Sequence, residues 1–92
     1  MKLPKDIIIG DTVWDIVKTK KLIVEGYECD GWADVANSKI FIRSNLSHES
    51  TLSTFIHEVL HGLDSEYDLE LEHKLIYKLE TAIARLLLDN YI

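Results

Sequence analysis

The chain has 92 residues, a length typical of one domain with one modest hydrophobic core. Apolar residues make up 47% of it and its net charge is -6, which favours a packed globular domain and argues against non-specific binding to nucleic acid or membranes. Cys29 is the only cysteine, so no disulfide can form within the chain, and no apolar run is long enough for a signal peptide or a membrane span. We therefore expect one domain over residues 1–92 of a soluble, cytoplasmic protein.

The first part of the chain has the composition of a β-hairpin. Residues 7–9 and residues 13–17 are mostly β-branched, and they flank Gly10-Asp11, a pair typical of tight turns. Residues 22–27 fit either a short strand or the end of the second strand. This region therefore predicts at least two antiparallel strands.

A second hairpin is predicted a little further along the chain. Residues 31–35 and residues 39–43 flank the turn residues at 37–38. Side chains alternate between the two faces of a strand, so Ile40 and Ile42 are expected on one face and their neighbours on the other.

After residue 46 the apolar residues recur with helical spacing. Ser47 suits the N-cap of a helix, and Glu49 in the first turn would be stabilised by the helix dipole. The stripe expected to face the core consists of Leu52, Phe55, Ile56, Val59, Leu60 and Leu63. Gly62 and the polar run at 64–68 predict the end of this helix.

A second helix is predicted over residues 71–88. Its expected core stripe consists of Leu75, Ile76, Leu79, Ile83, Leu86 and Leu87. The predicted fold class is therefore α+β: a small twisted sheet, antiparallel or mixed, followed by two α-helices.

The first predicted helix contains the pattern H-E-x-x-H, formed by His57, Glu58 and His61. Residues four apart lie on one face of a helix, so the two imidazoles can hold one zinc ion. Glu58 projects about 100° further round the helix, where it can reach a water on that ion and accept its proton. The pattern thus divides metal binding and general-base chemistry among three residues.

A catalytic zinc site keeps three protein ligands and one open position, so a third ligand is required. Asp64 lies on the same helix face as His57 but far along the axis. Glu72 and His73 open the second helix, and Glu80 lies two turns further on. Glu72 is expected near the middle of the apolar stripe, where a metal would satisfy its charge. The spacing alone does not choose among these residues.

The chain resembles the small zincin-like metallopeptidases of phages and bacteria related to the ImmA/IrrE group. The similarity lies in residues 5–17, in DGWADVANSKIFI, in the active-helix stretch STFIHEVLHGL, and in LIYKLETAIARLLLDN, which ends in an Asp-Asn pair. It implies that His57 and His61 are ligands and that Glu58 is the catalytic carboxylate. The third ligand of this family is usually acidic, and the matching position here is His73. His73 therefore ranks first, before Glu72 and Glu80.

The pattern and the resemblance together predict a zinc-dependent metallopeptidase acting on a peptide or protein substrate. Tyr67 or Tyr77 would stabilise the oxyanion, and the substrate would add as a strand beside residues 39–43. Two alternatives are a non-catalytic zinc-binding regulatory or interaction module and an α+β domain without metal. The sequence does not indicate an oligomeric state.

Overall fold

The computed structural model describes all residues from 1 to 92 and has a mixed four-stranded sheet. Its strand order is β1-β2-β6-β5, and the bounds are β1 (Asp6–Ile9), β2 (Thr12–Thr19), β5 (Gly31–Asp34) and β6 (Lys39–Arg43). Strands β1 and β2 pair antiparallel, as do β5 and β6, whereas β2 and β6 are parallel. The two predicted hairpins are therefore confirmed, and they join edge to edge through β2 and β6.

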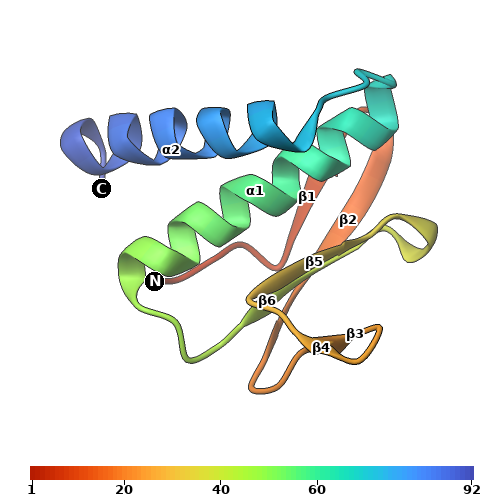
Figure 1. Cartoon of the computed structure of the whole chain (residues 1–92), viewed down its shortest axis with the longest axis horizontal. Helices are drawn as coiled ribbons and strands as arrows, with labels where there is room; N and C mark the ends of the chain where they lie inside the picture. Colours follow the sequence, from red (N-terminus) through yellow and green to blue (C-terminus); the bar gives the residue numbers. More distant parts are fainter.

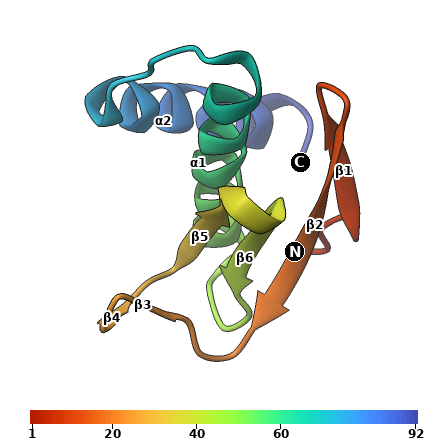
Figure 2. The same cartoon turned by 90° about the vertical axis from the view of Figure 1, so that its right-hand side faces the viewer.

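Residues 22–27 belong to a separate small hairpin. It consists of β3 (Ile23–Val24) and β4 (Tyr27–Glu28), which pair antiparallel with each other and lie outside the main sheet. Figure 2 shows this hairpin projecting away from the two helices. A short 3₁₀ turn, η1 (Val35–Asn37), connects β5 to β6.

Two helices follow the sheet, α1 (His48–Tyr67) and α2 (His73–Asn90), and they confirm the α+β class. Helix α1 contacts β1, β5 and β6 and also packs along α2, so it lies between the sheet and α2 (Figure 1). Neither helix has the length and apolar content that crossing a bilayer requires. Helix α1 is therefore the only helix that lies between two layers, and it carries the H-E-x-x-H pattern.

Helix α1 begins where the sequence predicts and ends within the predicted polar run. The Ser47 side chain accepts a hydrogen bond from the backbone N–H of Ser50 at 3.1 Å, as expected for an N-cap. The helix continues past Gly62 and ends at Tyr67, capped by Asp68, within the polar run 64–68 that predicts its end. The polar last turn is held by Glu66, whose carboxylate accepts hydrogen bonds from Thr12 and from the indole of Trp14, both at 3.0 Å. These bonds tie the last turn to β2.

Apolar side chains form two clusters, one on each side of α1. Between the sheet and α1, the buried residues are Ile9, Trp14, Ile40 and Ile42, with Phe55 and Val59 packed against them. Between the two helices, the buried residues are Leu52, Ile56, Leu60, Ile76 and Ala84. The predicted stripe of α1 is therefore divided between two cores, which fixes the rotation of the helix about its axis.

The predicted stripe of α2 is partly wrong. Ile76 is buried, but Leu75 is 43% exposed and Leu86 is 56% exposed. A helix that packs on one neighbour buries a narrower stripe than one between two layers, so the outermost leucines remain at the surface. Ala84, which the stripe did not include, is buried because the two helices approach closely there.

The predicted substrate strand at residues 39–43 is also wrong. This segment is β6, and it pairs with β2 on one side and with β5 on the other, so neither side can accept another strand. Strand β5 is the last strand of the sheet and contacts α1. The sheet edge beside the H-E-x-x-H helix is therefore β5.

Candidate metal centre

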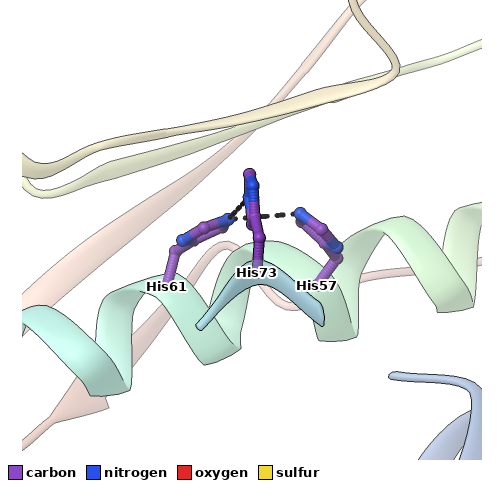
Figure 3. Close-up of side chains that lie close together, drawn as sticks. All are labelled: His57, His61 and His73. Carbon is purple, nitrogen blue, oxygen red and sulfur yellow. Dashed lines mark hydrogen bonds between the residues drawn. The ribbon is translucent and has the colours of Figure 1, made fainter. Parts of the chain in front are cut away.

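The three histidines His57, His61 and His73 form a cluster at the side of α1. The Nε2 atoms of His57 and His61 are 3.2 Å apart, and the Nε2 atoms of His61 and His73 are 3.1 Å apart. One ligand atom from each residue lies within 4.8 Å of the others, and Figure 3 shows the three rings turned toward a common point. This group could hold a metal ion.

The nitrogen separations can be compared with those that a metal requires. A tetrahedral zinc ion with bonds of about 2.0–2.1 Å holds its ligand atoms about 3.3–3.4 Å apart. The two observed Nε2 separations of 3.1 and 3.2 Å fall slightly short of this spacing. All three separations lie within 4.8 Å, so modest rotations of the rings would let the cluster hold a metal ion.

Helical spacing places the first two histidines, and a short loop places the third. His57 and His61 lie one turn apart on α1, which brings their ring centroids to 4.8 Å. Between the helices, Asp68 and Glu70 both adopt left-handed backbone conformations, and the Asp64 carboxylate accepts a hydrogen bond from the Leu71 backbone N–H at 3.1 Å. This turn reverses the chain, so the first residue of α2, His73, reaches the α1 histidines.

The other candidates for the third ligand lie elsewhere. Asp64 holds the interhelical loop, and Glu72 is the N-cap of α2. The expectation that Glu72 lies in the apolar stripe is wrong, because it precedes the helix and its side chain is exposed. Glu80 contacts His57 at Nδ1, the ring nitrogen that faces away from the cluster. His73 is therefore the candidate that the fold brings to the two α1 histidines.

Burial and neighbouring charge favour the form of His61 that binds metals. Burial lowers the pKa of His61, and the nearby His57 and His73 lower it further, whereas Asp64 acts in the opposite direction. A histidine ligates a metal through the lone pair of a neutral imidazole. The cluster therefore disfavours protonation of His61, its central member.

Glu58 lies beside the cluster, pressed against β5. Its side chain is buried, with 7% of the residue exposed. Burial raises the pKa of Glu58 from its ordinary value of 4.5 to about 7, and the negative charge of Glu80 raises this pKa further. His57 and a hydrogen bond from the Ala33 backbone act in the opposite direction. A carboxyl with a pKa near neutrality can both accept and return a proton at physiological pH.

Gly31 allows the close approach of β5 to Glu58. A Cβ atom at this glycine would lie 2.5 Å from the Thr54 methyl carbon and 2.9 Å from Glu58 Oε2. Non-bonded atoms do not approach this closely, so a side chain at position 31 would force Thr54, Glu58 or the strand itself to move. No sequence pattern indicates this constraint, because it depends on how near the strand comes to the helix.

Two adjoining hollows lie beside the histidine cluster and together form a groove. Gly31, His57, Glu58 and Tyr77 line two adjoining hollows, of about 270 and 530 Å³. The smaller hollow is also lined by Asp30, Thr54 and Glu80, all of which are polar. The larger one also contains His61, His73, Trp32, Ala33 and Val35 and is more apolar. The cluster therefore lies at the junction of an acidic hollow and a more apolar one.

Only one of the two candidate tyrosines lies at this groove. The ring of Tyr77 has its centroid 4.9 Å from that of His57 and 5.6 Å from that of His73. Tyr67 lies near the β1–β2 turn, where its hydroxyl oxygen is 3.7 Å from the Cβ position of Gly10. Tyr77 is therefore the tyrosine that a molecule in the groove would meet.

Comparisons with models of protein families, with curated proteins and with solved structures found no match to this chain. The three-histidine group, which could hold a metal ion, is consistent with the resemblance to zincin-like metallopeptidases. Any functional conclusion therefore rests on the residues and their geometry.

Proposed function

We propose that this protein is a zinc-dependent metallopeptidase in which His57, His61 and His73 hold the metal and Glu58 is the general base. The observation that carries the proposal is the convergence of three imidazole nitrogens, 3.1 and 3.2 Å apart, beside a buried carboxyl in an open groove. A purely structural cluster of three histidines would have no need of a carboxyl with a raised pKa next to it. Perturbed titratable groups in a groove are a common mark of functional sites.

Zinc is the metal that this ligand set suits best. Three neutral imidazoles with a fourth position open are typical of catalytic zinc sites. No cysteine belongs to the cluster, and calcium and magnesium prefer oxygen ligands. Zinc held by the three histidines would lower the pKa of a bound water and polarise the carbonyl of the peptide bond.

The protein's own residues would perform the remaining steps. Glu58 accepts the proton of the attacking water and returns it to the amine of the leaving peptide. The Tyr77 hydroxyl is suited to donate a hydrogen bond to the developing oxyanion, because its ring lies against His57 and lines both hollows. The free edge of β5 is suited to pair with an extended peptide, which would hold the peptide along the groove.

The direct test is to substitute Glu58 by Gln and compare zinc content and cleavage with those of the parent chain. Both proteins are purified without a chelator or a histidine tag, and a mixture of peptides serves as substrate. We expect stoichiometric zinc in both and cleavage only by the parent, because Gln cannot take up the proton. A Gln variant that cleaves as fast as the parent contradicts the role of Glu58. Absence of zinc from the parent contradicts the metal site.

One observation favours a second candidate, a zinc-binding regulatory or interaction module without catalysis. The Glu58 carboxyl is hydrogen-bonded by the Ala33 backbone and lies against Gly31, so part of its bonding capacity is used by β5. In such a module Glu58 would secure the strand to the helix and would not activate water. Stoichiometric zinc with no cleavage of any peptide by the parent chain is the result that supports this candidate.

A further inference from the structure

Glu80 makes the closest polar contact with the histidine cluster that comes from outside it. Its Oε1 atom is 2.7 Å from Nδ1 of His57, and the two side chains are only 19% and 14% exposed, respectively. Because a carboxylate only accepts hydrogen bonds, this contact requires a proton on Nδ1 of His57. In the neutral imidazole the lone pair is then on Nε2, the nitrogen that faces His61.

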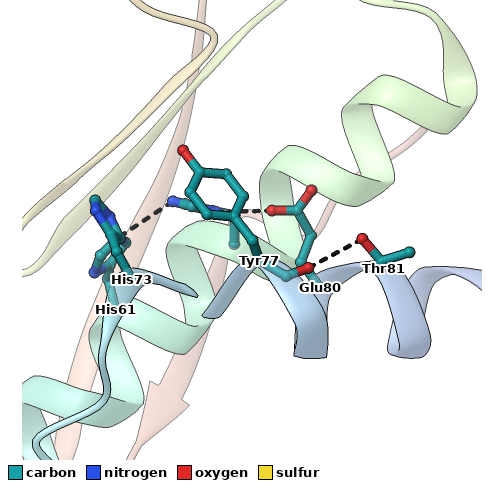
Figure 4. A network of polar contacts seen from close by, with 6 residues as sticks. His61, His73, Tyr77, Glu80 and Thr81 are labelled. Carbon is teal, nitrogen blue, oxygen red and sulfur yellow. Dashed lines mark hydrogen bonds and ion pairs between the residues drawn. The ribbon is translucent and has the colours of Figure 1, made fainter. Parts of the chain in front are cut away.

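The contact belongs to a row of side chains on one face of α2. His73, Tyr77 and Glu80 are spaced by four and three residues, so they project from the same side of the helix (Figure 4). His73 reaches His61, the Tyr77 ring lies against His57, and Glu80 reaches the far nitrogen of His57. Helix α2 therefore approaches the α1 histidines with a possible ligand, a ring and a carboxylate.

We propose, on the basis of the proposed metal site, that Glu80 is a positioning residue that acts through His57 and is not itself a ligand. It holds the ring in the orientation that turns Nε2 toward the metal, and its charge makes that nitrogen a stronger ligand. A carboxylate on the outer nitrogen of a ligating histidine typically contributes about 10- to 100-fold to metal affinity. This role also explains why a carboxylate is tolerated between two helices without a lysine or arginine as partner.

The test compares two substitutions that each remove one negative charge from a hollow that Glu49 and Glu80 both line, next to the groove. Glu80→Gln keeps the size of the side chain and removes the charge next to His57. Glu49→Gln is the matched control, because Glu49 and Glu80 line one hollow and Glu49 contacts no histidine. Zinc affinity is measured by competition with a chelating dye, and cobalt is then titrated to record the absorption spectrum of the site.

We expect zinc affinity to fall about 10- to 100-fold in Glu80→Gln and to change by less than about twofold in Glu49→Gln. The shape of the cobalt spectrum should stay that of the parent, because the ligands are the same. Equal losses in the two variants overturn the proposal, since they would show a general effect of charge. A changed spectrum in Glu80→Gln also overturns it, because Glu80 would then be a ligand.

A purely structural role for Glu80 gives a different result. If the contact only attaches α2 to α1, the unfolding free energy of the metal-free Gln variant falls while its zinc affinity stays that of the parent, and the proposal is overturned. A nitrogen–proton correlation spectrum of the zinc-loaded parent adds a second check, since His57 must carry its proton on Nδ1. If the parent binds neither zinc nor cobalt, the proposed function fails as well, so the two failures are distinguishable.

Discussion

The buried carboxyl of Glu58 should lower the stability of the metal-free protein at neutral pH. Its pKa rises from 4.5 to about 7, chiefly because folding removes the side chain from water. One pKa unit corresponds to about 1.4 kcal/mol, so the ionised carboxyl costs the folded state about 3 kcal/mol above pH 7. Substitution by Gln removes the ionisation and keeps the shape, so the variant should be more stable than the parent.

The stability that Glu58→Gln gains over the parent should increase as the pH rises. Below the unfolded pKa of 4.5 both states keep the proton, and the ionisation has no effect on stability. As the pH rises toward 7 the unfolded chain releases a proton that the folded chain retains, so the stability of the parent falls. The advantage of Glu58→Gln should therefore grow from about 1 kcal/mol at pH 5 to about 3 kcal/mol at pH 8.

Urea denaturation of metal-free protein in the presence of a chelator measures this difference. Tryptophan fluorescence, to which the fully buried Trp14 and the partly exposed Trp32 contribute, reports unfolding. The titration of His61 is common to parent and variant and cancels in their difference. Glu49→Gln, at an exposed position, is the control and should show no such dependence. Equal stability differences at pH 5 and pH 8 would refute the reasoning, because the Glu58 pKa would then be the same in both states.

Three further predictions concern the same groove. At pH 7, zinc binding to the metal-free protein should release protons, because a cation next to Glu58 favours its ionised form; calorimetric heats that do not depend on the buffer would contradict this. Tyr77→Phe should lower kcat by about 10²-fold with little change in KM, whereas Tyr67→Phe should cleave like the parent. Gly31→Ala should lower the unfolding free energy measured in urea by about 1–3 kcal/mol. Adding Thr54→Ser, which removes the nearest methyl group, should recover part of that loss. A Gly31→Ala protein as stable as the parent would show that β5 is not confined there.

Local spacing determined the part of the site that could be predicted from the sequence. The helical period placed His57 and His61 on one face, and the polar N-cap residue Ser47 located the start of the helix. The resemblance to zincin-like metallopeptidases ranked His73 above Glu72, and the structure brings His73, not Glu72, to the cluster. The approach of His73 depends on the left-handed residues Asp68 and Glu70, whose side chains give no sign of that conformation.

The contacts that the sequence did not predict depend on how layers pack. Glu80 was a candidate third ligand, but its contact with Nδ1 of His57 depends on how α2 packs, with Ile76 and Ala84 buried against α1. The constraint at Gly31 depends on the distance between β5 and α1, which no periodicity encodes. Both contacts join segments far apart in the chain, so they follow from tertiary structure and not from local pattern.

The histidine at position 73 changes the charge of the proposed site. In the metallopeptidases that the chain resembles, this ligand is usually acidic and neutralises part of the metal charge. Three neutral imidazoles leave a zinc ion with its full charge, which strengthens its effect on a bound water and a carbonyl. Here the compensating carboxylates, Glu58 and Glu80, lie next to the ligands and not among them. Glu80 would supply its charge through His57, while Glu58 stays free of the ion and able to exchange a proton. In the proposed mechanism, metal binding and proton transfer are thus separated, because one carboxyl lies against β5 and the other on α2.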